Sequence, residues 1–208
     1  MEHPIVITYL LLAVTVLVSV KAFADSDFKR SLLFNAHDIV HYKKWYRCFT
    51  HGFIHGDYTH LAFNMFGLYV FGIGLEKHFL IEYGYRGYFL YTILYAAGIL
   101  FATLPALTKH KDNPGYNSLG ASGAISAVIF AYILVFPNAQ LGLILIPGLV
   151  LPAYIFGPLY IVAEYFMAKR GGTGIAHDAH IAGAVFGIVF LILVDYNYIL
   201  NFINAFTS

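Results

Sequence analysis

The sequence predicts an all-α membrane protein, a six-transmembrane-helix bundle, and two observations carry this prediction. Of the 208 residues, 60% are hydrophobic and only 11% are charged, whereas soluble domains carry about 25% charged residues. So few charged side chains leave too little polar surface to cover a soluble core. Apolar segments of about 20 residues, the length that crosses ~30 Å of hydrocarbon, also recur along the chain.

Six apolar segments are the candidate spans, in chain order. They cover residues 4–24, 59–79, 87–107, 120–136, 141–166 and 178–194. The polar residues before the first are Glu2 and His3, so it lacks the basic start of a signal peptide, and we expect a retained helix. The fifth is interrupted by Pro147, Pro152 and Pro158, because proline breaks helical hydrogen bonding.

Polar connections separate these segments. Residues 25–58 are predicted to form a long loop rich in aromatic residues and histidine, residues 108–119 a second polar loop, and residues 167–177 a glycine-rich loop. The two similar halves of an inverted-repeat transporter are not apparent, so we expect residues 1–208 to form one domain. The net charge is +1 and the basic residues are scattered, which argues against nucleic-acid binding.

A serine stands at the start of the fourth segment, where polar groups within a membrane suggest function. Gly120 and Ala121 precede Ser122, and Gly123 follows it. A helix start presents unpaired N–H groups, which stabilise negative charge such as an oxyanion. Small residues also allow close helix packing, and this string, taken alone, favours packing over catalysis.

His180 lies at the start of the sixth segment, about one turn before Gly183 and close to the same helix face. Gly183 and Gly187 form a pair of small residues that lets a neighbouring helix approach. His180 can therefore reach that neighbour, and an imidazole beside a serine hydroxyl forms a nucleophile–base pair. A histidine that only hydrogen-bonds a loop explains the same pattern equally well.

His60 and Asn64 are four residues apart in the second segment and share a helix face. Both can donate hydrogen bonds toward one point, as an oxyanion site requires, although a structural polar pair is an equal alternative. A metal site built on His177 and His180 is a further alternative. Beyond His60 or Asp178 it has no obvious further ligand, so we expect no metal.

Taken together, these segments resemble the rhomboid family. The resemblance covers most of the chain, from residues 45–64 to residues 180–187. It depends on three motifs that occur in order on three predicted helices: His60-x-x-x-Asn64, Gly120-x-Ser122-Gly123, and Ala179-His180-x-x-Gly183-x-x-x-Gly187.

The resemblance implies an intramembrane serine endopeptidase that cleaves transmembrane substrates with a dyad of Ser122 and His180. His60, Asn64 and the backbone N–H of Ser122 match the oxyanion site, and Glu76 matches an acidic position at the end of the second helix. The implied partners are transmembrane protein substrates and the lipid bilayer, with no cofactor and no metal. The implied location is the cell's inner (plasma) membrane.

The chain departs from the family pattern near the base and in the first loop. Four residues after the nucleophile the family commonly has an aromatic residue that stacks on the base, and here Ser126 stands there. Another group is therefore expected to hold His180. The first-loop pair reads Tyr46-Arg47 instead of Trp-Arg.

The distribution of basic residues and the resemblance to the family predict opposite membrane orientations. Most basic residues lie in or beside the connections after the first, third and fifth segments. The positive-inside rule would place the long loop 25–58 in the cytoplasm. The resemblance places that loop and the active site outside, with the N-terminus in the cytoplasm, and we follow the resemblance.

Two rival functions remain open at this point. One is a catalytically inactive rhomboid-like protein that binds membrane proteins, which the presence of both Ser122 and His180 disfavours. The other is a small transporter or channel in which His60, Asn64 and His180 line a polar path.

Overall fold

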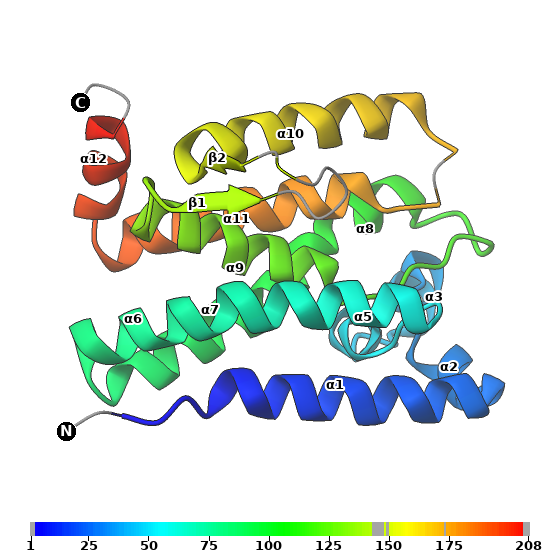
Figure 1. Ribbon diagram of the computed structural model, residues 1–208. Coiled ribbons are helices and arrows are strands. Elements are labelled where there is room, and N and C mark those ends of the chain that lie inside the picture. The colour runs from blue at the N-terminus through cyan, green and yellow to red at the C-terminus, as the bar shows by residue number, and fades with distance from the viewer. Residues whose placement is uncertain (1–2, 143–147, 149, 173, 206–208) are drawn as a thin grey trace.

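The computed structural model describes residues 3–142, 148, 150–172 and 174–205, and its long helices run side by side (Figure 1). The longer single helices are α1 (Ile7–Ala24), α7 (Arg86–Ala102), α9 (Ser122–Val135), α10 (Ala153–Arg170) and α11 (His177–Val194). One further helical stretch is continuous and consists of α5 (Tyr58–Gly67), the π-helical turn η2 (Leu68–Gly72) and α6 (Ile73–Tyr83). The chain is therefore mostly helical.

Shorter helices lie in the connections and after the last long helix. They are α2 (Ser26–Leu32), α3 (Ala36–Tyr42), α4 (Arg47–Thr50), the 3-10 helix η1 (His51–Phe53), α8 (Leu104–His110) and α12 (Asn197–Asn204). Residues 25–58, predicted as one long loop, therefore contain four short helices instead. Asp25 and Asn35 accept hydrogen bonds from the first turns of α2 and α3, which is how these short helices begin.

The predicted fifth span, residues 141–166, is wrong in its first part. Strand β1 (Gln140–Gly142) pairs antiparallel with β2 (Val150–Pro152), so the described chain is not purely α-helical. The helix begins only after Pro152, whose backbone is extended, and it continues to Arg170, into the predicted glycine-rich loop. Pro158 lies inside α10, and Pro147 lies outside the described residues.

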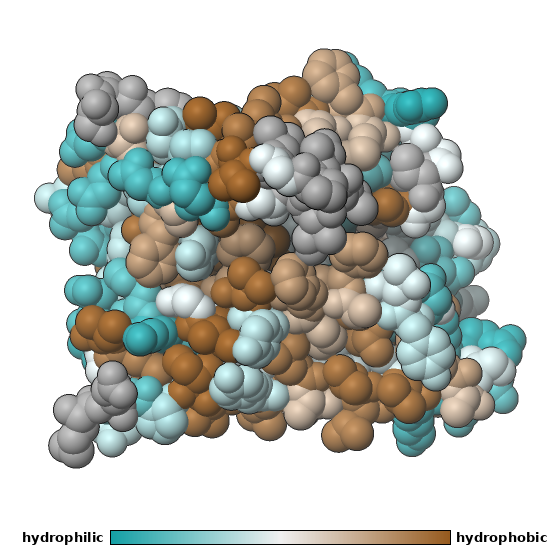
Figure 2. Space-filling model, in the orientation of Figure 1, coloured by the Kyte–Doolittle hydropathy of each residue, from teal (hydrophilic) through white to brown (hydrophobic). Residues whose placement is uncertain are grey.

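The distribution of polar and apolar surface indicates a membrane protein. Within the described residues, three helical stretches are long and apolar enough to cross a membrane: Ile7–Ala24, Arg86–His110 and His177–Val194. Figure 2 shows hydrophobic side chains gathered over the middle of the visible face and polar ones toward the two ends of the helices. This pattern suits helices that meet lipid along their middle and water at both ends.

Helix α9 lies at the centre of the bundle. It is 14 residues long, so at 1.5 Å per residue it covers only about 21 Å, less than the hydrocarbon core. Most of its residues are buried in the largest hydrophobic cluster, together with side chains of α6, α7 and α11. Protein, and not lipid, therefore surrounds most of α9, which begins at Ser122.

Glycines bring α9 and α11 into close contact. A Cβ added at Gly183 would collide with the carbonyl oxygen of Gly123, and one at Gly187 would collide with that of Ala127. On the other side of α9, a Cβ at Gly123 would collide with Ala102 of α7. Only glycine leaves room for backbones at this spacing. The small-residue pattern in the sequence thus sets the distance between the two helices.

A glutamate of α6 anchors the start of α1. The buried carboxylate of Glu76 accepts hydrogen bonds from the backbone N–H groups of Val6, Ile7 and Thr8 at 2.9, 2.8 and 2.7 Å. Helix α1 has no acidic residue in its own first turn. Glu76 supplies the missing acceptor and a negative charge at the positive end of the helix dipole.

Backbone hydrogen bonds connect residues 25–58 to the chain just before Ser122. Phe34 and Ser118 exchange two backbone hydrogen bonds of 3.0 and 3.1 Å, and Gly120 N–H donates to the carbonyl of His51 at 3.0 Å. Arg47 is buried within this segment and donates to the carbonyl of Leu33 at 3.1 Å. These contacts fix the approach of the chain to α9.

Candidate active site

The structure brings together Ser122 and His180 from two different helices. Ser122 is the first residue of α9, and His180 lies in the first turn of α11. The Ser122 Oγ lies 2.7 Å from Nε2 of His180, a hydrogen bond of ordinary length for these groups. A hydroxyl that donates to an imidazole nitrogen is the arrangement a serine nucleophile and its general base require.

The sharp entry of the chain into α9 exposes Ser122. Gly120 has φ of +113°, a conformation that L side chains rarely adopt. A Cβ there would also lie 2.9 Å from Cε1 of the His60 ring. Both constraints select glycine, and the turn leaves the N–H of Ser122 at a helix start, where the helix itself provides no acceptor.

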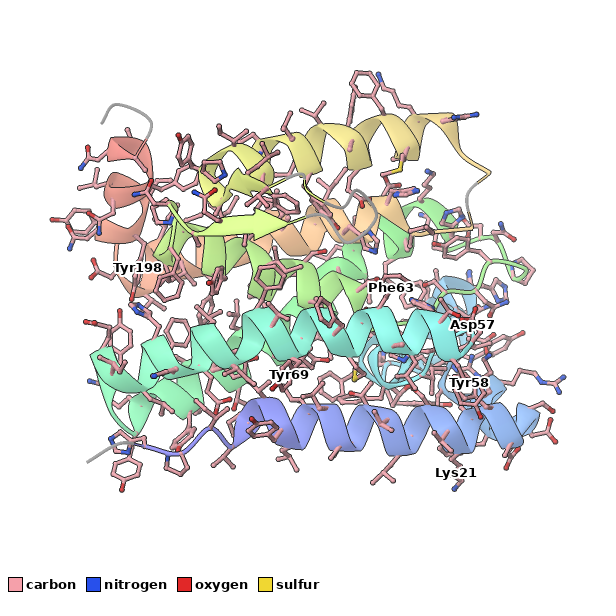
Figure 3. The ribbon with its side chains drawn as sticks, in the orientation of Figure 1. Lys21, Asp57, Tyr58, Phe63, Tyr69 and Tyr198 are labelled. Atoms are coloured by element: carbon pink, nitrogen blue, oxygen red, sulfur yellow. The ribbon has the colours of Figure 1, made fainter. Side chains whose placement is uncertain are left out.

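His60 and Asn64 share a cavity with the serine and the histidine. This cavity of about 820 Å³ is lined by His60, Asn64, Ser122 and His180. Asp57, which caps α5, and Phe63 on α5 are labelled in Figure 3 and line the same cavity. The four residues predicted as site residues therefore face one space.

The hydrogen bonds of His60 and Asn64 leave donors for an oxyanion. Nδ1 of His60 accepts from the N–H of Gly56 at 3.4 Å, and in that tautomer Nε2 carries the proton. The side-chain amide of Asn64 donates to the carbonyl of His60 at 2.9 Å, which uses one of its two N–H bonds. Each side chain can therefore offer one N–H to a negative oxygen.

Two buried histidines support the loop next to the site. Nδ1 of His55 lies 2.9 Å from Oγ of Ser19 on α1, and its ring packs against that of His60. Burial lowers the pKa of His55 to about 3 and that of His51 to about 4. Both rings are therefore neutral at physiological pH and add no charge near Ser122.

Sequence reasoning missed one residue of the site, Glu164 of α10. Its buried carboxylate lies 2.6 Å from Nδ1 of His177 through Oε2, and 3.1 Å from Nδ1 of His180 through Oε1. A signal existed, because Glu164 is the only charged residue in the apolar segment 141–166. An ionisable residue in such a segment is by default a candidate for function.

Ser126, the departure from the family pattern, contacts a tyrosine of α10. Its Oγ lies 3.3 Å from the hydroxyl of Tyr160, one helical turn before Glu164. A serine takes up less room than an aromatic ring and allows this contact. The group next to His180 is thus the Glu164 carboxylate, supplied by α10.

Within the described part of the chain, the side chains placed best to hold a metal ion are those of Glu164, His177 and His180. The potential ligand atoms of Glu164, His177 and His180 all lie within 4.8 Å of one another. The 2.6 Å separation of Glu164 and His177 is the length of a charge-assisted hydrogen bond. A tetrahedral ion with bonds of about 2.0–2.2 Å would need these two atoms farther apart. The geometry is that of a hydrogen-bonded cluster.

The chain is similar to known proteins over most of its length. The family model described as Rhomboid domain matches residues 42–197. RHOMBOID-like protein 12, mitochondrial, from Arabidopsis thaliana is 30% identical over 151 residues, which is 65% of this chain and 42% of that protein. Rhomboid protease GlpG from Salmonella paratyphi A is 26% identical over 187 residues, which is 89% of this chain and 61% of that protein.

A chloroplast relative has intermediate similarity. Rhomboid-like protein 11, chloroplastic, from Arabidopsis thaliana is 28% identical over 163 residues, 73% of this chain and 53% of that protein. The chain thus spans between two fifths and two thirds of the length of these three relatives.

Proposed function

Since the chain belongs to the rhomboid family, we propose that it is an intramembrane serine protease with Ser122 as nucleophile and His180 as general base. The observation that carries this proposal is the 2.7 Å hydrogen bond between Ser122 Oγ and His180 Nε2. A relative of the chain is named a rhomboid protease, which supports the same reaction.

The proposed reaction follows from the geometry of the cavity. Ser122 Oγ forms a bond to the scissile carbonyl carbon while its proton passes to Nε2 of His180. The electron pair of the carbonyl moves to oxygen, and the N–H groups of Ser122, His60 and Asn64 stabilise the resulting oxyanion. His180 then protonates the leaving amine, and water hydrolyses the acyl-enzyme.

The proposed substrates are transmembrane helices of other proteins. A peptide bond within a regular helix is shielded by the helix itself, so a substrate must unwind locally to reach Ser122. Water must reach the same place. We propose that the polar connections, including the chain at Gly171, Gly172 and Gly174 after α10, where the backbone has positive φ, provide this path for water.

We further infer six membrane spans within one domain of residues 1–208. They are α1, the α5–α6 stretch, α7 with α8, α9, α10 and α11. We also propose that the N-terminus faces the cytoplasm and that the protein resides in the inner (plasma) membrane of the cell. The organelle names of two relatives make membrane fractionation the direct test of that location.

The test is purification in detergent and incubation with a generic transmembrane substrate, comparing the wild type with Ser122→Ala. The proposal expects cleavage by the wild type and none by the variant. A wild type that binds the substrate without cutting it would favour an inactive membrane-protein binder. Solute flux in vesicles without cleavage would favour a transporter or channel.

A further inference from the structure

A buried carboxylate lies beside the nitrogen of His180 that does not face Ser122. Nε2 of His180 accepts from the serine hydroxyl, and Nδ1 lies 3.1 Å from Oε1 of Glu164. These contacts join a serine on α9, a histidine on α11 and a glutamate on α10. The resemblance to the family implies only the dyad of Ser122 and His180, and the third group, Glu164, comes from the structure.

The structure assigns to Glu164 the role of a positioning residue that completes a triad with Ser122 and His180. This inference rests on the proposed protease function and deepens it. Glu164 acts on His180 and does not touch the substrate. Its carboxylate orients the imidazole and stabilises the positive charge that the ring acquires when it takes the serine proton.

The surroundings of Nδ1 support this assignment. This atom is buried and has no aligned hydrogen bond within the described residues, so its contact with Glu164 is an ion-pair distance with an imperfect N–H direction. A buried donor without an acceptor is costly, and the carboxylate is an acceptor within reach. Catalytic hydrogen bonds are often poorly aligned before substrate binds and tighten in the reacting complex.

Glu164 is itself held in place from two sides. Its Oε2 lies 2.6 Å from Nδ1 of His177, which is three residues before His180 and so on a nearby face of α11. The carboxylate therefore lies between two imidazoles, one at each oxygen. Helix α10 also contacts α9 through Tyr160 and Ser126. This contact holds the face of α10 that carries Glu164 toward α9 and α11.

The carboxylate determines which nitrogen of His180 carries the proton. Oε1 can only accept, so it favours the form in which Nδ1 bears hydrogen and Nε2 presents a lone pair to Ser122. After Nε2 takes the serine proton, both nitrogens bear hydrogen and the ring is positive. Glu164 stays ionised, so one proton moves from Ser122 to His180 and none to the glutamate.

Glutamine at position 164 would remove the negative charge beside His180 with almost no change of size. An amide has a single acceptor oxygen, whereas the carboxylate serves both His177 and His180. One imidazole would therefore face an NH₂ group, which in the case of His180 favours the wrong tautomer, and in either case no negative charge would remain to stabilise the imidazolium of His180. In soluble serine proteases, the equivalent loss lowers kcat by about 10⁴-fold.

The test compares Glu164→Gln, Glu164→Asp and Glu76→Gln in detergent, with kcat and KM measured on the transmembrane substrate used for Ser122→Ala. Glu76→Gln is the matched control, because Glu76 is also a buried helical glutamate but its hydrogen bonds, within the described residues, go to the start of α1. We expect Glu164→Gln to lower kcat roughly 10²- to 10⁴-fold with KM within about twofold. Glu164→Asp keeps the charge but sets it farther back, so an intermediate kcat is expected.

The control separates positioning from stability. Glu76→Gln is expected to lower the unfolding temperature and to leave kcat of the folded protein within about twofold of the wild type. Equal kcat in the wild type and Glu164→Gln would overturn the inference. A kcat of Glu164→Asp equal to that of the wild type would also overturn the inference. This second variant keeps the inference testable if Glu164→Gln does not fold.

Two other results have distinct meanings. Wild-type activity that requires Zn²⁺ and is lost in EDTA would make Glu164, His177 and His180 a metal site and would also overturn the inference. A wild type no more active than Ser122→Ala would refute the protease function itself. An active wild type with an equally active Glu164→Gln would refute only the role of Glu164.

Discussion

Replacing Gly183 by alanine tests whether the close approach of α9 and α11 sets the geometry of the reaction. A methyl group there would overlap the carbonyl oxygen of Gly123 and lie 2.9 Å from its carbonyl carbon. Carbon contacts are favourable only at about 3.5–4.0 Å, so α11 must move away from α9 by about 1 Å. Ser122 adjoins Gly123, and His180 lies one turn before Gly183, so the movement acts directly on this pair.

The magnitude follows from the hydrogen bond between the two helices. The Oγ–Nε2 distance is 2.7 Å, and a shift of about 1 Å lengthens it to about 3.7 Å, beyond hydrogen-bond range. A misplacement of this size costs roughly 10²-fold in rate. The overlap destabilises the fold by about 1–3 kcal/mol, partly offset by about 1 kcal/mol from alanine's better helix propensity.

The assay is substrate cleavage by Gly183→Ala, with thermal unfolding in the same detergent. The control is Gly157→Ala on α10, because the atoms nearest to a Cβ there are side-chain atoms of Ile133 and Phe130 at 3.4–3.5 Å, an ordinary contact. It should retain activity and be as stable as the wild type or slightly more so. Wild-type cleavage by Gly183→Ala would refute the reasoning, since the pair would then tolerate separation of the helices.

Two further predictions concern stability. Glu76→Gln removes the charged acceptor at the start of α1 and should lower the free energy of unfolding by about 1–3 kcal/mol, and an unchanged unfolding temperature would contradict this role. Acid should destabilise the fold through His51 and His55, whose pKa values fall from 6.5 to about 4 and about 3 on burial. Below pH 6.5 the unfolded chain binds protons that the folded chain does not, so each histidine removes about 1.4 kcal/mol per pH unit until its folded pKa is reached. Thermal unfolding between pH 7.5 and 5 measures this loss, which should be smaller in His51→Asn, and a flat profile would exclude it.

The sequence was most informative where small and polar residues recur at helical spacing. The Gly183 and Gly187 pair predicted a close neighbour for the sixth segment, and α9 lies there. The pattern also indicated which face of that helix carries His180. Residues 58 positions apart, Ser122 and His180, were linked in this way without any local contact between them.

The missed features depend on contacts that local patterns do not reveal. Continuous hydropathy extended the fifth segment across β1 and β2, because short apolar strands and helices are alike in hydropathy. The polarity of residues 25–58 predicted a loop, although Phe34 and Ile39 belong to a small hydrophobic core in this segment. Glu164 was visible as a lone charge, but its partners come from another helix, and only the packing of α10 on α11 reveals them.

The most direct test is labelling with a fluorophosphonate probe, followed by peptide mapping of the modified residue. Such probes react with serines that a neighbouring base has activated. The prediction is an adduct on Ser122 in the wild type and no adduct in His180→Ala. An unlabelled Ser122 in folded wild-type protein, or equal labelling without His180, would contradict a hydroxyl activated by that imidazole.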